Sequence, residues 1–232
     1  MSKLLTTLLL TLWLSVGTVW AGDFEDGLAA AIKQDYVTAN KKFKIAAEKG
    51  NASAQLMLGL SYAAGLGVAQ DYAQAFFWFK LAAAQGNSGA QFNLGTMYSN
   101  GHGVVQDYAE AVRWYKLAAA QGDSGAQENL GHMYDNGHGV VQDYAEAVRW
   151  YKLAAAQGNV NAQYNLASMY YSGKGAVQDY VRAHMWSNLA SVSSEENKKK
   201  RDAIASFMTG QQVAEAQKLA RECQARNFKN CD

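Results

Sequence analysis

Apolar residues recur along most of the chain at the spacing of a helix. Ala90, Leu94 and Tyr98 stand four residues apart, so they fall on one side of an α-helix. The same residue types return at a fixed offset of 36 residues, which predicts a chain built from stacked supersecondary units. The copies of this first-helix pattern are Ala54/Leu58/Tyr62, Ala126/Leu130/Tyr134 and Ala162/Leu166/Tyr170.

A second apolar pattern follows each copy of the first. Ala111, Trp114 and Ala118 predict a second helix whose buried side sets one large ring against small neighbours. We interpret the tryptophans as core residues, with a cost of roughly 3–5 kcal/mol for Trp114→Ala. The copies are Ala75/Trp78/Ala82, Ala147/Trp150/Ala154 and Ala183/Trp186/Ala190.

Capping residues and glycines mark the ends of these helices. Asn87 before the first helix and Asp107 before the second can accept hydrogen bonds from free first-turn amides. Glu110 stands three residues after Asp107, and Glu146 after its counterpart, which predicts a capping box. Glycine pairs such as Gly101 and Gly103 allow the positive φ that ends a helix and reverses the chain.

These signals divide the chain. Residues 22–51 form a degenerate N-terminal repeat, with a first helix from Phe24 to Lys33. Four full repeats follow at 52–87, 88–123, 124–159 and 160–191. Residues 192–232 are predicted to be C-terminal capping helices and a tail. S-x-x-E at Ser193 and T-x-x-Q at Thr209 predict helices at about 195–207 and 211–226.

The N-terminus has the layout of a cleavable secretory signal. Lys3 precedes an apolar run from Leu4 to Val16, and the stretch ends in small residues up to Ala21. The run is short for a membrane span, so we expect cleavage after Ala21, at residues 1–21, and a periplasmic or secreted mature protein. The alternative is a membrane anchor. After signal cleavage we expect no membrane association.

Composition narrows the class of partner. The chain has 232 residues, 49% hydrophobic and 18% charged, which is typical of a globular protein. Its net charge of +1 gives no support for nucleic acid as a partner. The absence of proline suits an almost entirely helical chain. The run at 198–201 reads as a solvated charged surface.

Two cysteines, Cys223 and Cys231, stand near the C-terminus. An even pair in an exported protein is predicted to form one disulfide. Two unpaired thiols in a frayed end are the alternative.

The repeat A-x-x-x-L-G-x-x-Y-x-x-G-x-G-V-x-x-D-x-x-x-A-x-x-W-x-x-x-A-A-x-x-G resembles the Sel-1-like repeat, a subclass of the tetratricopeptide-type solenoids. The match covers residues 52–191, with partial matches at 23–51. The resemblance implies an all-α, right-handed α/α superhelical solenoid, with first helices lining a concave surface. It also implies a non-enzymatic adaptor or scaffold.

The resemblance also points to an asparagine position. Asn93, Asn129 and Asn165 match a site that is often asparagine in the family. In related tetratricopeptide domains such an asparagine can bind a peptide backbone. Met57 departs from this pattern in the first full repeat.

The free side of the first helices is where the repeats disagree. Residues at these positions differ in size, charge and aromaticity, while the buried positions stay the same. Aromatic residues on a free surface more often mark contact sites than solvent-facing drift. We therefore predict that a peptide or partner protein binds this side, through Phe92, Asn93, Thr96, Glu128, Asn129, His132, Asp135, Tyr164, Asn165, Ser168 and Tyr171.

Two other functions remain open. Some cysteine-rich secreted members of the family bind or hydrolyse β-lactams, but S-x-x-K and K-T-G are absent from this sequence. A structural, self-assembling solenoid is the other alternative, whereas the leading hypothesis expects a monomer. Glu128, His132 and Asp135 share one helix face, but three mixed ligands on one helix make a weak metal site. No catalytic residue, metal or cofactor is therefore predicted.

Overall fold

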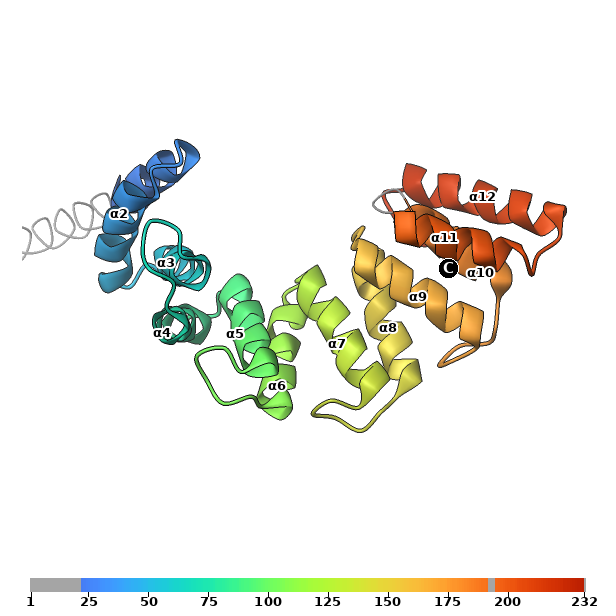
Figure 1. Cartoon of the computed structure of the whole chain (residues 1–232), viewed down its shortest axis with the longest axis horizontal. Coiled ribbons are helices and arrows are strands. Elements are labelled where there is room, and N and C mark those ends of the chain that lie inside the picture. Colours follow the sequence, from blue (N-terminus) through green and yellow to red (C-terminus); the bar gives the residue numbers. More distant parts are fainter. Residues whose placement is uncertain (1–21, 192–194, 232) are drawn as a thin grey trace, which may run out of the picture. The chain divides into compact units, whose positions relative to one another are not determined.

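The computed structural model describes residues 22–191 and 195–231, and all regular elements in these ranges are α-helices (Figure 1). The predicted signal at residues 1–21 and the predicted helix start at Ser193 lie outside the described residues. After a helical segment at residues 22–32, the helices are α2 (Tyr36–Glu48), α3 (Ala52–Ala64), α4 (Tyr72–Ala84), α5 (Ser88–Asn100), α6 (Tyr108–Ala120), α7 (Ser124–Asn136), α8 (Tyr144–Ala155), α9 (Val160–Ser172), α10 (Tyr180–Ala190), α11 (Glu195–Ala205) and α12 (Gly210–Ala225).

The helices pack in two compact units that divide just before α6. In the first unit α3 pairs with α4, α2 packs on α3, and α5 packs on α4. In the second unit α7 pairs with α8 and α9 with α10, while α6 packs on α7 and α8 on α9. Pairs of consecutive helices that stack in chain order make an α/α solenoid, so the predicted fold class is confirmed.

The predicted caps form as the sequence indicates. Asp71 Oδ1 accepts from the amides of Ala73 at 2.9 Å and Gln74 at 3.0 Å. Asn51 Oδ1 accepts from the Ala54 amide at 2.8 Å. Gly65 ends α3 in the left-handed region at φ 70°. The later repeats use Asn87, Asp107, Asp123, Asp143, Asn159 and Asp179 in the same way.

The predicted capping boxes at the starts of α6 and α8 are wrong. Asp107 caps the α6 amides, but the Glu110 carboxylate pairs with Arg113 Nη2 at 2.9 Å instead of returning to the cap. An arginine one turn along offers a charged donor, which is a stronger partner than a neutral amide. The box at Thr209 does form, with reciprocal bonds to Gln212.

An aromatic ring packs on a mid-helix glycine in several repeats. A methyl group at Gly131 in α7 would lie 2.5 Å from Cδ1 and Cε1 of Tyr151 in α8. Gly59 meets Phe79 in the same way, at 2.6 Å. Glycine therefore stands mid-helix because the ring of the facing helix occupies the space that a side chain would need.

This packing corrects the interpretation of two of the repeat tryptophans, Trp114 and Trp150. Tyr151 is 1% exposed, whereas the preceding Trp150 is half-buried and has the Arg149 guanidinium 4.2 Å from its ring centroid. Trp114 is half-buried in the same manner, with Arg113 at 4.5 Å. The residue after each of these tryptophans supplies the main core ring, because one step along a helix rotates the side chain by 100°. Trp114 and Trp150 therefore lie at the border of the core, whereas Trp78 and Trp186, 8% and 2% exposed, are core residues as predicted.

The second glycine of each turn lies against the backbone of the preceding repeat. A Cβ at Gly139 would be 2.3 Å from the carbonyl carbon and oxygen of Tyr108. The neighbouring His138 stacks on the Tyr108 ring, with centroids 4.8 Å apart. The turn is therefore a joint between consecutive second-helix starts, and its histidine has a packing role.

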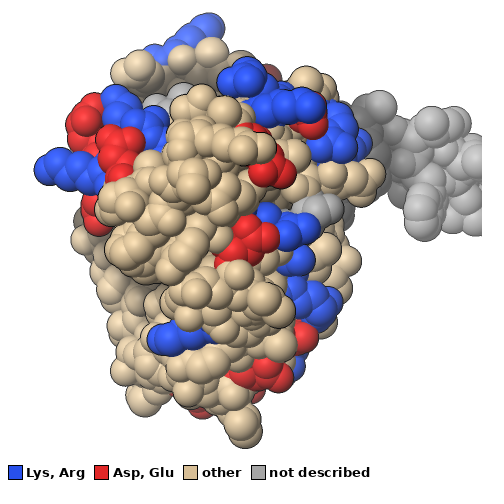
Figure 2. Space-filling model, turned by 90° about the vertical axis from the view of Figure 1, so that its right-hand side faces the viewer, with Lys and Arg blue, Asp and Glu red and all other residues tan. Residues whose placement is uncertain are grey.

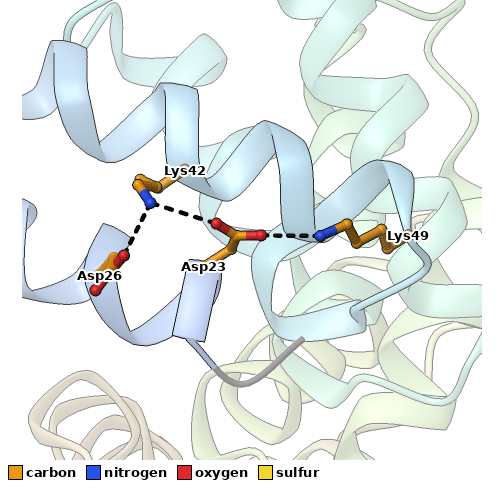
Figure 3. A network of polar contacts seen from close by, with 4 residues as sticks. All are labelled: Asp23, Asp26, Lys42 and Lys49. Carbon is orange, nitrogen blue, oxygen red and sulfur yellow. Dashed lines mark hydrogen bonds and ion pairs between the residues drawn. The ribbon is translucent and has the colours of Figure 1, made fainter. Parts of the chain in front are cut away.

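An ion-pair network ties residues 22–32 to α2 (Figure 3). The Asp23 carboxylate lies between Lys49 Nζ at 2.9 Å and Lys42 Nζ at 3.4 Å, and Lys42 also reaches Asp26 at 2.8 Å. Hydrogen bonding from Lys49, and then from Lys42, holds the pKa of Asp23 below its ordinary value. The network fastens the first described turn to the rest of the N-terminal repeat.

The C-terminal segment closes the second unit. α12 packs on α10, and both contribute to one apolar cluster. Cys223 and Cys231 are joined, with Cα atoms 5.1 Å apart, so the pair is placed to form a disulfide. The loop between them carries Phe228, whose ring lies against Gly158.

Candidate functional site

The predicted recognition residues of the first unit lie on α5. Phe92, Asn93 and Thr96 are all half-buried. Asn93 Nδ2 donates to the Gly89 carbonyl at 2.7 Å, and Thr96 Oγ1 donates to the Phe92 carbonyl at 3.1 Å. Both polar side chains therefore hydrogen-bond to their own helix backbone, and a peptide would have to exchange the Asn93 bond to engage its amide.

Four predicted residues of the second unit lie on α7. Glu128, Asn129 and Asp135 are half-buried, and His132 is exposed. Burial raises the pKa of the Glu128 carboxyl. One carboxylate oxygen accepts from Asn165 Nδ2 of α9 at 3.2 Å, so this asparagine links consecutive first helices.

The surface of α9 is not open as predicted. Lys200 of α11 lies over the Tyr164 ring, 3.7 Å from its centroid, and donates to Ser168 Oγ. Phe207, just after α11, lies 5.7 Å from Tyr171 between ring centroids. The prediction that Tyr164, Ser168 and Tyr171 stand free is therefore wrong.

The register of α11 explains this coverage. Lys200 follows Tyr164 by the repeat offset of 36, and Phe207 follows Tyr171 by the same offset. α11 thus stands in for a further first helix. Its remaining surface is polar, and of its residues only Ile204 is fully buried. The surface left for a partner in the second unit consists of Glu128, Asn129, His132 and Asp135.

The side chains that could hold a metal do not gather. Within residues 22–191 and 195–231, no group of three or more His, Cys, Asp or Glu side chains is arranged to hold a metal ion. His102 stacks on Tyr72 at 4.6 Å, as His138 does on Tyr108. In the described part of the chain, no helix has the length and apolar character that crossing a bilayer requires.

Charge on the surface is mixed. On the face shown in Figure 2, Lys and Arg side chains are interspersed with Asp and Glu, and neither sign dominates. This distribution matches the net charge of +1. The face in this view has no continuous basic surface of the kind that binds nucleic acids.

One exposed apolar position escaped the sequence analysis. Phe77 of α4 is half exposed, although the two corresponding residues 36 and 72 positions later are Arg113 and Arg149. An alignment of the second helices shows this phenylalanine in place of an arginine. It was missed because the second helices were interpreted as architecture alone.

Comparison with known proteins identifies the repeat. The Sel1 repeat model matches five consecutive segments, residues 22–51, 52–87, 88–123, 124–159 and 160–191. No curated protein matches the chain.

Solved structures agree with this match. The crystal structure of c5321, a protective antigen of uropathogenic Escherichia coli strains with an SLR fold, is 31% identical with a TM-score of 0.79. The alignment covers 94% of this chain and 48% of that one, so the chain spans about half of that relative. A Sel1 repeat protein from Oxalobacter formigenes is 31% identical with a TM-score of 0.68, over 81% of this chain and 79% of that chain. A sel1 repeat protein from Klebsiella pneumoniae subsp. pneumoniae, at 22% identity and a TM-score of 0.52, shares the fold. The chain belongs to the Sel1 repeat family.

Proposed function

We propose that this protein is an exported, non-enzymatic scaffold that binds a peptide or partner protein through the free side of its first helices, the side that the family resemblance places on a concave surface. Sel1 repeats are in general protein-interaction modules, which supports the scaffold role. Export rests on the sequence layout of residues 1–21.

The observation that carries the proposal is the half-buried carboxylate of Glu128 on α7. The other full repeats place Leu56, Phe92 and Tyr164 at this position, all apolar or aromatic. A half-buried carboxylate there is unfavourable for folding, since desolvation penalises its charged form. A residue that works against the local packing pattern is expected where function requires it. The Glu128 carboxylate would accept hydrogen bonds from a partner's amide or cationic groups.

The neighbours of Glu128 fit this role. His132 stands one turn further along α7 and is exposed, and Asp135 follows on the same side. Together they offer hydrogen-bond acceptors and an imidazole ring along one helix. The fourth repeat supports the mode of binding, because there the same side of the first helix already holds another helix, α11, through Lys200.

A photocrosslinking experiment in the exporting cell tests the surface. A benzophenone amino acid at position 132 should give defined protein adducts, while the same probe at Val141, a turn residue 88% exposed, should not. Adding Glu128→Gln to the variant that carries the probe at position 132 should weaken those adducts. The same adducts at both positions, or adducts indifferent to Glu128→Gln, would rule this surface out.

Two further measurements test the other parts of the proposal. The mature protein should fractionate with the exported pool, and its intact mass should correspond to a chain starting at Gly22. Full-length precursor in the cytoplasm would contradict export. The purified protein should not turn over a chromogenic β-lactam, and clear turnover would favour the hydrolase alternative.

A further inference from the structure

The side of α10 that carries Met185 and Leu189, here called its outer side, is covered by α12. Met185 is 1% exposed and Leu189 is 8% exposed. The α12 residues Ala216 and Ala220 are buried in the same apolar cluster. The chain thus shows how the outer side of a second helix accommodates another helix.

The positions equivalent to Met185 on α6 and α8 are open but polar. Met185 corresponds to Arg149 and Arg113 in the two preceding repeats, at offsets of 36 and 72. Each arginine is exposed, pairs with a glutamate one turn earlier and lies over the adjacent tryptophan. The outer sides of α6 and α8 therefore present these ion pairs to water, beside Leu117 and Leu153, which are 43% and 42% exposed.

The outer side of α4 is open and apolar. Phe77, which corresponds to Met185, is 50% exposed, and Leu81, which corresponds to Leu189, is 38% exposed. Gln74 stands where α6 and α8 carry the glutamate, so no ion pair can form there. The Phe77 ring packs edge-on against its neighbour Trp78, with centroids 5.0 Å apart, and remains half exposed. An exposed aromatic ring beside a leucine is the usual anchor of a protein contact.

We propose that the outer side of α4, formed by Ala73, Phe77 and Leu81, is a docking site for an amphipathic helix of another protein. The template for the occupant is α12, which buries small residues on the stripe Ala216, Ala220 and Cys223 at helical spacing. Small side chains let the two helix backbones approach closely, and a partner with the same stripe would cover Phe77 and Leu81 as α12 covers Met185 and Leu189. This site lies on a second helix and is independent of the first-helix surface proposed above.

The probe for this site is a fluorescein-labelled peptide of residues 210–225 with Cys223→Ala, titrated with the full-length protein. Fluorescence anisotropy should show saturable binding. The variant Phe77→Arg/Gln74→Glu introduces the residue pair of α6 and α8, so it should fold normally and weaken binding by about tenfold or more. The matched control Leu117→Gln, on α6, should bind like the wild type.

Two checks separate loss of the site from loss of the fold. Circular dichroism should give the double variant the wild-type helix content, and the milder Leu81→Gln should also weaken binding. Phe92→Ala, on the first-helix surface, should leave peptide binding unchanged, which separates this site from the proposed function.

Three results would overturn the proposal. The first is no saturable binding at millimolar protein, and the second is equal affinity for wild type and the Phe77→Arg/Gln74→Glu variant. The third is concentration-dependent dimerisation in light scattering that this variant abolishes, since the occupant would then be a second copy of the chain.

Discussion

Replacing Gly131 by alanine tests whether the ring-on-glycine contact organises each repeat. Alanine is favoured over glycine in a helix by about 1 kcal/mol, so on propensity alone the variant should be more stable. The new methyl group would lie 2.5 Å from two carbons of the Tyr151 ring and 3.0 Å from a third. Carbon atoms prefer about 3.5–4.0 Å, and the ring is fully enclosed, so it cannot swing aside.

The steric overlap between the new methyl group and the Tyr151 ring should cost more than alanine gains in helix propensity. Overpacking of a tight core costs about 1–3 kcal/mol, and an overlap of this depth belongs at the upper end. About 3 kcal/mol of strain less about 1 kcal/mol of propensity leaves a net destabilisation of about 2 kcal/mol. For a chain of this size that corresponds to a fall of about 4–8 °C in the thermal midpoint.

Circular dichroism at 222 nm during thermal and guanidinium unfolding measures the effect. The control is Gly210→Ala in the first turn of α12, where nothing lies within 4 Å of the added methyl, and which should be neutral or slightly stabilising. If Gly131→Ala matched Gly210→Ala, the contact would not limit packing and the reasoning would fail.

The chain also offers a compensating variant. In the fourth repeat the equivalent pair is Ala167 and Ser187, so the glycine is lost where the ring is lost. The double variant Gly131→Ala/Tyr151→Ser copies this pair. Its cost should be smaller than the sum of the two single costs by about 1 kcal/mol or more. Strict additivity would show that the two positions are not coupled.

Three other predictions follow from the structure. Titration of the denatured, unreduced protein should find no free thiol at Cys223 or Cys231, and two reactive thiols per chain would exclude the bridge. Trp150→Ala should cost less than Tyr151→Ala, for which about 3–5 kcal/mol is expected, and the reverse order in guanidinium unfolding would contradict the assignment of the core ring. The raised pKa of Glu128 means that the folded state binds its proton more tightly, so stability falls as pH rises from the unfolded carboxyl pKa through the folded one. Glu128→Gln should therefore stabilise the protein at pH 7 and lose that advantage in acid, whereas a constant difference across pH would refute the link to ionisation.

The capping residues and glycines in the sequence were sufficient to predict where the helices begin and end. Asn51, Asp71 and Gly65 act through hydrogen bonds and backbone angles within a few residues of themselves, so their roles can be read without knowing the neighbours. The choice between Trp150 and Tyr151 as the core ring could not be read in this way. Both lie within 100° on the helix, and the position of α7 decides which of them is enclosed.

The candidate site depended still more on distant parts of the chain. Tyr164 has the character of a surface contact residue, but Lys200 lies over it because α11 continues the register of the repeats. The charged sequence of α11 concealed this, since its 198–201 run resembles a solvated surface. Phe77 could have been identified by comparing second helices as closely as first helices, because the arginine that it replaces recurs in two repeats.

The contact between Gly139 and the Tyr108 backbone limits how the length of this protein can vary. Both sides of that joint are main-chain atoms, so no change of side chain can make room for an extra residue in the turn. An insertion of one or two residues there would separate consecutive repeats, whereas an insertion of 36 residues would add a joint like the existing ones. Residues 136–158 are identical to residues 100–122, as a chain lengthened by whole repeats would be.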